Sequence, residues 1–517
     1  MKRSRVLLYL AVLAAALAYL SAWHAADSAP GARPSAEGLM APLDDAYIFG
    51  QYARQALHGQ WLHYTPGAPI STGVSSATWL LALTALMGLG WPLTWAAWAL
   101  GLACLGWSVH SLLRLGARLF PSLPDWLLPL LFLAHASSVS LFFQGMDSGL
   151  LLAALLAAAE AALDPEARAK FWCLGTILAF TRPEGQLAFP ALALARAWHR
   201  QSRAKTAVLA LSLAALPSFG LWAISGSMVP DSVRPKTAAM DRLSFSERSA
   251  TAVRYAAQVT TELMMGIVPA RASVGYVGNA QAGNDPAKHF PPLALLAAFL
   301  GIVFAWDKKE QRAWWLGMSA AWMGILLALS WDLPVGWHRH RYLGSLWPLM
   351  ILGVAAALQA LRGAGKPWDR AGRSALLTLW LGFGLLTWPW FLRATYQSAA
   401  NYAVANREAA FALKELPGDQ AVAVEDAGLI AYYGGRSTVD LLGVTDHRLA
   451  LVQARGNEAV LLALDEQRPM LALLHPVRSG SYSGLWTSNG LLTVQQPLGG
   501  MTLYRFNWES ATIVKKP

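Results

Sequence analysis

The sequence predicts a polytopic α-helical membrane protein with an α/β domain at its C-terminal end. Of the 517 residues, 55% are hydrophobic and 14% are charged, whereas soluble proteins carry roughly 25% charged residues. Long apolar stretches recur through residues 1–396, and beyond them the apolar runs shorten to strand length. The composition excludes a water-soluble enzyme of this length, and the lack of long polar tracts excludes a disordered chain.

Residues 1–23 combine a basic start, MKRSR, with a long apolar stretch. A secretory signal peptide is the alternative interpretation, but the small-residue cleavage pattern at 28–30 is poor. We therefore expect an uncleaved first helix whose N-terminus stays in the cytoplasm because of its positive charge.

Ten further apolar stretches predict, with the first, about eleven transmembrane helices. They lie near 93–113, 126–143, 149–163, 169–181, 185–198, 206–226, 290–306, 313–330, 342–361 and 374–394. Basic residues gather in alternate loops, and their excess there accounts for the whole net charge of +11. Short basic loops stay cytoplasmic, so an odd number of spans puts the C-terminus outside. The basic charge therefore requires no nucleic-acid partner.

The apolar segment 76–90 is left out of this count. At 15 residues it reaches roughly 22 Å as a helix, short of the ~30 Å hydrocarbon core. Counting it as a span would also place every later basic loop outside. We expect a helix that lies in the outer membrane–water interface, near the end of the first outer segment (24–92).

Residues 397–517 are expected to form a water-facing α/β domain, separate from the membrane module 1–396. Helical patterns lie at 399–416 and 456–467. Short apolar runs predict strands at 421–424, 438–442, 470–474, 491–494 and 502–506.

Ionisable residues gather at the predicted outer edge of the bundle. They lie in two long segments, 24–92 and 227–289, and in turns at 144–148, 181–185 and 331–341. Charges at the rim of an apolar bundle are costly unless paired or solvated, so we expect a site for a charged, lipid-borne substrate. These residues are Asp44, Asp45, Arg54, His58, Asp147, Arg182, Glu184, Asp231, Arg234, Lys236, Asp332, His338, Arg339, His340 and Arg341.

Asp44 and Asp45 begin the helical pattern DDAYIFGQYARQAL. One explanation is that an Asp side chain caps this helix by accepting an unpaired backbone N–H. A cap needs one carboxylate, so the pair also predicts a general base with an orienting partner. In sugar transfer such a base takes the proton of the acceptor hydroxyl as that oxygen attacks the anomeric carbon.

A phosphate leaving group needs cations around it rather than a general acid. Arg suits bidentate phosphate binding, and His adds a donor. The alternatives are that these cations anchor the bundle at lipid headgroups, and that Arg182 and Glu184 form a weak surface pair. The candidate phosphate ligands are Arg182, Lys236, His338, Arg339, His340 and Arg341.

Several stretches resemble the GT-C fold glycosyltransferases that use polyprenyl-phosphate sugars. They resemble in particular the mycobacterial terminal arabinofuranosyltransferase family and its bacterial relatives. The most specific stretches are DDAYIFGQYARQALHGQWLHYTPGAPISTGVSSATW (44–79) and AFTRPEGQLAF (179–189). Supporting stretches, in the order of the family, are QGMDSGLLLAALLAAAEAAL (144–163), VPDSVRPKTA (229–238), RHRYLGSLWPLMILG (339–353) and EDAGLIAYYGGRSTVDLLGVTD (425–446).

The resemblance implies a multi-pass enzyme of the bacterial inner membrane whose active site and C-terminal domain face the periplasm. It implies that a pentose or hexose moves, with inversion, from a polyprenyl-phosphate donor to a glycan, lipid or protein acceptor of the cell envelope. The catalytic base maps onto Asp44 or Asp45, and cations of the outer loops hold the donor phosphate. Further substrate contacts are expected from Tyr47, Arg54, Asp147, Glu184 and Asp231.

Three other functions stay open at this point. A lipid-linked sugar flippase would favour charges near the bilayer centre, and a scaffold would tolerate loss of both aspartates. An O-antigen-ligase-like enzyme would use a diphosphate-linked donor. No resident metal is predicted: the adjacent carboxylates could bind a divalent cation, but no second ligand set is identifiable, and Cys104 and Cys173 lack metal-ligand spacing.

Overall fold

The computed structural model describes residues 2–198, 203–234, 244–250, 312, 314–320, 347–363, 367–475, 486–487 and 490–509. The chain divides into two compact units. The first unit comprises Met1–Ala22, Trp98–Pro217 and Leu243–Thr395, and the second comprises Trp23–Ala97, Ser218–Arg242 and Tyr396–Pro517. The second unit thus combines a segment of the predicted membrane module with the predicted C-terminal domain.

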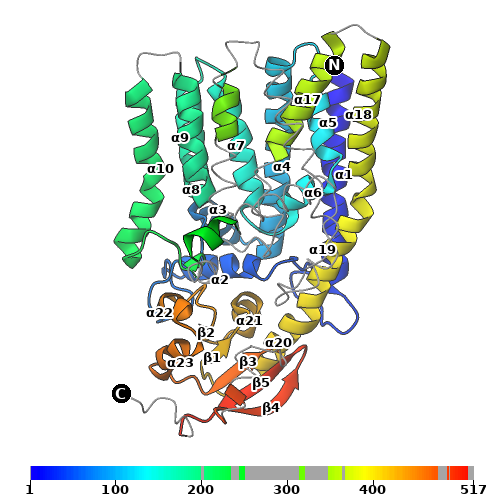
Figure 1. Cartoon of the computed structure of the whole chain (residues 1–517). Coiled ribbons are helices and arrows are strands. Elements are labelled where there is room, and N and C mark those ends of the chain that lie inside the picture. The colour runs from blue at the N-terminus through cyan, green and yellow to red at the C-terminus, as the bar shows by residue number, and fades with distance from the viewer. Residues whose placement is uncertain are drawn as a thin grey trace. The chain divides into compact units, whose positions relative to one another are not determined.

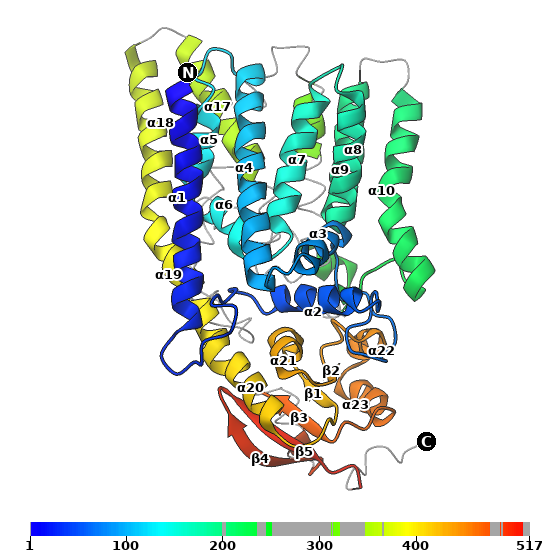
Figure 2. The same ribbon diagram turned by 180° about the vertical axis from the view of Figure 1, so that it is seen from behind.

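The first unit is helical, and Figures 1 and 2 show α7 to α10 side by side, with α1 beside α18. Most of the predicted apolar stretches within the described ranges are helices. Their bounds are α1 (Lys2–Asp27), α4 (Leu93–Leu119), α7 (Ser148–Ala162), α8 (Arg168–Thr181), α9 (Pro183–Ala197), α10 (Arg203–Ser225), α17 (Trp347–Gly363) and α18 (Pro367–Leu386).

Within the described ranges, four helices are long and apolar enough to cross a membrane, or five if one bent pair counts as a span. They are Ser4–Asp27, Leu93–Leu119, Arg203–Ser225 and Arg370–Glu415. The predicted spans at 290–306 and most of 313–330 fall outside the described residues. The chain is a membrane protein, and the total of about eleven spans stays a prediction.

The prediction of one continuous transmembrane helix over residues 126–143 is wrong. It is divided into α5 (Leu127–Leu133), α6 (Ala136–Ser140) and a 3-10 turn, η1 (Leu141–Phe143), and the chain then bends by 114° into α7. The Ser138 hydroxyl donates to the carbonyls of Phe132 and His135, both at 2.7 Å, and so competes with helical backbone bonding. Gly101 of α4 permits the close approach, because a Cβ there would lie 2.0 Å from the Phe142 oxygen.

The hairpin at 181–185 is confirmed. Helix α8 ends at Thr181, Arg182 is extended, and Pro183 opens α9. Proline is favoured at a first helical position because its missing N–H has no partner to lose there. The helix pair packs together, and α8 also packs against α7.

The second unit contains α2 (Asp45–Leu57), α3 (Ala77–Gly88) and a five-stranded sheet in the order β2-β1-β3-β5-β4. The strands are β1 (Val422–Val424), β2 (Thr438–Asp440), β3 (Leu471–Leu474), β4 (Leu492–Leu498) and β5 (Met501–Phe506). Strand β1 is parallel to both β2 and β3, whereas β5 is antiparallel to β3 and β4. All five predicted strands are confirmed, and 76–90 contains the expected helix as α3.

The helices of the tail include two that the sequence pattern did not predict. These are α21 (Ala427–Gly434), which connects β1 to β2, and α22 (His447–Val452). The predicted helices are present as α23 (Asn457–Asp465) and as a run of α19 (Trp388–Tyr402), a π-helical segment η4 (Ala403–Arg407) and α20 (Glu408–Glu415). Leu449, Val460 and Leu464 from α22 and α23 join the buried core of the sheet.

Candidate functional site

Asp44 caps a helix, but not the one that it precedes. Its side chain makes no hydrogen bond to α2. Instead its two oxygens accept one backbone amide each, from Gly428 and Leu429, both at 2.8 Å. These amides belong to the first turn of α21. The expectation of a cap on 45–57 is therefore corrected: the unpaired N–H groups that the carboxylate satisfies lie 384 and 385 residues further along the chain.

The close contact of these segments depends on a glycine. A Cβ at Gly428 would lie 2.1 Å from the carbonyl oxygen of Asp44 and 2.7 Å from its Oδ2. No side chain fits at those distances, so the EDAGL stretch has glycine where the two backbones meet. Asp45, in the first turn of α2, is half-buried, whereas Asp44 is buried.

Burial raises the pKa of the Asp44 carboxyl well above its usual range, and the nearby charge of Asp426 raises it further. The amides of Leu429 and Gly428 act in the opposite direction, because they favour the ionised form. A carboxylate with a raised pKa is a stronger base near neutral pH than an exposed one. The electrostatics therefore suit proton abstraction.

Asp426 and His475 lie beside this contact, and neither was predicted from the sequence as a site residue. Nε2 of His475 donates to Oδ2 of Asp426 at 2.6 Å, and the amide of Asn406 donates to the same oxygen at 2.8 Å. Asp426 follows β1 and His475 follows β3, at the carboxyl ends of two adjacent parallel strands. From β1 the chain continues to β2 on one side, while β3 lies on the other side. Ligands of α/β sheets bind at such a switch point.

A signal for these residues exists in the sequence. His475 directly follows the apolar run of β3, and Asp426 is the second residue after the run of β1. Asp440 is the last residue of β2. If β1, β2 and β3 had been predicted as parallel neighbours, these residues would have been expected at the same edge of the sheet. The strand order, however, could not be read from the runs.

Asp231, a predicted substrate contact, is buried and bonded on both oxygens. The Thr72 amide donates to one oxygen at 2.7 Å, and Nδ1 of His447 lies 2.8 Å from the other. The Asp231 amide donates in return to the Thr72 hydroxyl at 3.0 Å. The two long segments and the tail, which the charge pattern placed on one side of the membrane, thus contact one another within the second unit.

Tyr47 and Arg54 fix α2 in place. The Tyr47 hydroxyl accepts the Ala41 amide at 3.0 Å and donates to the sulfur of Met40 at 3.2 Å. The Arg54 guanidinium donates to the Tyr432 carbonyl at 2.8 Å and lies 4.0 Å from the centre of its ring. Both side chains were predicted to contact substrate, and in this structure they bind neighbouring segments of the second unit.

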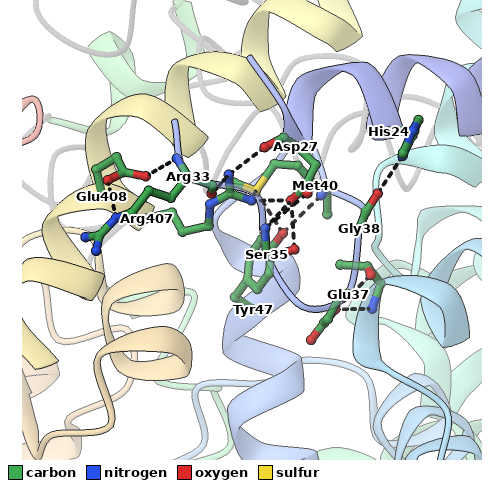
Figure 3. Close-up of polar contacts among 12 residues, drawn as sticks. His24, Asp27, Arg33, Ser35, Glu37, Gly38, Met40, Tyr47, Arg407 and Glu408 are labelled. Atoms are coloured by element: carbon green, nitrogen blue, oxygen red, sulfur yellow. Dashed lines mark hydrogen bonds and ion pairs between the residues drawn. The ribbon is translucent and has the colours of Figure 1, made fainter. Parts of the chain in front are cut away.

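A buried ion pair holds the segment that leads to Asp44 (Figure 3). Arg407, in the π-helical segment, pairs with Asp27 and donates to the carbonyls of Asp27 at 2.7 Å and Arg33 at 2.6 Å. The side chains of Asp27 and Arg407 are 1% and 0% exposed. The Ser35 hydroxyl donates to Asp27 at 2.7 Å. The two ends of residues 27–35 are therefore held by the buried side chains of Asp27, Ser35 and Arg407.

Arg182 is paired with two carboxylates in the first unit. It donates to Oε1 of Glu184 at 2.7 Å and to Oδ1 of Asp147 at 3.0 Å. All three residues are buried, so the pair with Glu184 forms as expected but is not a surface bridge. Arg182 already pairs with two acidic side chains, so a phosphate would have to compete with them for one positive charge.

The other candidate phosphate ligands lie outside the described residues. These are Lys236, His338, Arg339, His340 and Arg341. In the described part of the chain, no group of three His, Cys, Asp or Glu side chains is placed to hold a metal ion.

Comparison with known proteins places the chain by its fold. Residues 393–513 match a family described as a domain of unknown function, DUF8728, and no curated protein matches the chain. Apo ArnT from Cupriavidus metallidurans is similar with a TM-score of 0.51 at 12% identity, over 100% of this chain and 99% of that chain. The fold is GT-C.

Two further solved structures are similar at 12% identity. ArnT from Cupriavidus metallidurans bound to undecaprenyl phosphate has a TM-score of 0.49 over 98% of this chain and 99% of that chain. An oligosaccharyltransferase from Archaeoglobus fulgidus, in complex with Zn and sulfate, has a TM-score of 0.46 over 96% and 73%.

Proposed function

We propose that this chain is a membrane glycosyltransferase that moves a pentose or a hexose from a polyprenyl phosphate to a hydroxyl of a cell-envelope glycan, lipid or protein. The GT-C fold and the quoted motifs support the class of reaction. The observation that carries the proposal is the placement of the aspartate pair. Asp44 is fixed by two backbone amides, and Asp45 follows it at the start of α2.

The reaction is a single displacement. The acceptor oxygen forms a bond to the anomeric carbon as the bond from that carbon to the phosphate oxygen breaks, so the configuration inverts. The hydroxyl proton passes to a carboxylate of the Asp44–Asp45 pair, and the electron pair of the broken bond leaves with the polyprenyl phosphate. One aspartate acts as the base and the other orients it.

The donor phosphate is assigned to cations of the outer segments. Lys236, Arg339 and Arg341 are the first choice, with His338 and His340 as added donors. Arg182 is a weaker candidate, because Asp147 and Glu184 already pair with it. The positions of the basic loops support an outward-facing, periplasmic site in the inner membrane.

The test is transfer of label from undecaprenyl phosphate carrying a radiolabelled pentose or hexose, in membranes that contain the full chain. We expect both Asp44→Asn and Asp45→Asn to lower transfer. The variant that removes the general base should lower it by at least about a hundredfold. Asp465→Asn is the matched control, because among the described residues its carboxylate pairs with Arg468, three positions further along, at 3.0 Å. Near-normal transfer by both site variants would overturn the mechanism.

The same assay separates the alternatives. A diphosphate-linked donor that replaces the monophosphate would indicate the ligase-like reaction. Movement of the labelled lipid across the bilayer without transfer would indicate a flippase.

A further inference from the structure

The amino terminus of α21 is capped in an unusual way. The residue at the N-cap position normally accepts the amides two or three residues further on. Asp426 occupies that position with an extended backbone (φ −107°, ψ 95°), yet its side chain makes no cap bond. Asp44, from another segment, takes the amides of Gly428 and Leu429 instead.

The carboxylate of Asp426 is held elsewhere. Oδ2 accepts from both His475 Nε2, at 2.6 Å, and the Asn406 amide, at 2.8 Å. Asn406 is buried in the π-helical segment, and His475 follows β3. Both donors thus come from elements that are separate from α21, and they keep Asp426 away from the amides of its own helix.

The two carboxylates also repel each other. Charge on Asp426 disfavours ionisation of Asp44, and Asp45 adds to this effect. Glu425, whose carboxylate accepts the His475 amide at 3.2 Å, is a further acidic group next to the cluster. The carboxylates of Asp44 and Asp426 repel each other, and only one of them can accept the amides of Gly428 and Leu429 at a time.

We propose that Asp426 and Asp44 compete for the Gly428 and Leu429 amides, and that Asn406 and His475 decide the competition by holding Asp426. Asn406, Asp426 and His475 are then positioning residues for the aspartate pair, an inference that rests on the proposed function. If Asp426 is released, it caps α21 itself and displaces Asp44. The Asp44–Asp45 pair then loses its fixed position.

The experiment is a rescue in the full-length protein. Asn406→Ala/His475→Ala releases Asp426, and we expect transfer from labelled undecaprenyl-phosphate sugar to fall on the order of 100-fold, as for a misplaced catalytic group. Adding Asp426→Ala removes the competitor, and we expect transfer within about threefold of wild type, a difference of less than ~1 kcal/mol. A triple variant as inactive as the double variant would overturn the competition.

A second arm needs no activity. We measure the shift of the unfolding midpoint caused by Asp44→Asn in the detergent-solubilised chain. The shift should be present in wild type, absent in the double variant and present again in the triple variant. Equal shifts in all three backgrounds would contradict the inference. If the double variant does not fold, the triple variant must recover folding, and failure to do so refutes the competition.

The two arms separate this inference from the proposed function. Absence of transfer by the wild type from any polyprenyl-phosphate sugar would reject the glycosyltransferase. The stability pattern would still report whether Asn406 and His475 control the cap.

Discussion

Asp44 accepts the backbone amide of Leu429 at 2.8 Å, across 385 positions of the chain. The contact makes the tail part of the candidate site, because the first turn of α21 is completed by the residue that precedes α2. The position of Asp45 follows from the same contact, since it is the next residue. We therefore regard the segment before α2 and the tail as one structural element of the candidate site.

Gly428→Ala should separate α21 from Asp44. The new Cβ would lie 2.1 Å from the Asp44 carbonyl oxygen, so the backbone must shift. We expect a loss of about 1–3 kcal/mol in the free energy of unfolding, typical of overpacking, with loss of transfer. Gly434→Ala in the same helix is the control, because its Cβ would make only ordinary contacts at 3.6 Å. Similar behaviour of the two variants in thermal unfolding would refute this reason for the glycine.

Asp440 should make stability depend on pH. Burial raises its pKa from 3.8 to about 7, against the amides of Thr445 and Leu442, which lower it. Because the pKa of Asp440 is higher in the folded state than in the unfolded chain, its full stabilising contribution is present at a pH below the unfolded pKa. This contribution is lost as the pH rises towards about 7. We expect the unfolding midpoint of the solubilised chain to fall over this range, and Asp440→Asn to flatten the fall.

Asp465→Asn is the control for that measurement, because this half-buried side chain pairs with Arg468 rather than with Asp440. It should keep the wild-type pH slope. A slope that Asp440→Asn leaves unchanged would mean that another group titrates.

Breaking the Asp27–Arg407 pair should be strongly destabilising. Either Asp27→Asn or Arg407→Met leaves an uncompensated buried partner, which costs about 3–5 kcal/mol in unfolding free energy. The combined variant should recover part of this loss. Arg33→Ala, which removes the partly exposed ion pairs with Glu408 and Glu415, should cost about 1 kcal/mol or less. A mild effect of Arg407→Met in chemical unfolding would contradict the assignment.

Arg182→Gln distinguishes a structural role from a phosphate ligand. The buried carboxylates of Asp147 and Glu184 would lose their counter-charge, and we expect about 3–5 kcal/mol of destabilisation. Adding Glu184→Gln should restore part of it. A raised KM for the lipid donor with unchanged stability would instead support direct phosphate binding.

The sequence predicted the positions of helices and strands better than the contacts between them. Strands β1 to β5 and helix α3 follow from local apolar patterns, which depend on near neighbours. Helix α21 was missed because eight residues between two short strands leave little periodicity to detect. The break within 126–143 was missed because it depends on Gly101 and on hydroxyl groups that compete for backbone carbonyls, and neither changes the apolar pattern.

The candidate site shows the same division. The Asp44–Asp45 pair was recognised because two adjacent acids at a helix start are conspicuous. The partner of Asp44 was not, because hydrogen bonds across hundreds of residues depend on strand order. Asp426 and His475 bear no fixed spacing to the pair and enter the site only when parallel strands align their ends.

Sugar transfer itself can be measured with purified protein, undecaprenyl phosphate bearing a radiolabelled sugar, and envelope acceptor from cells that lack this protein. We predict that label moves to the acceptor with equimolar release of undecaprenyl phosphate, and that Asp44→Asn/Asp45→Asn abolishes both. Release and transfer that persist undiminished in that double variant would contradict this prediction.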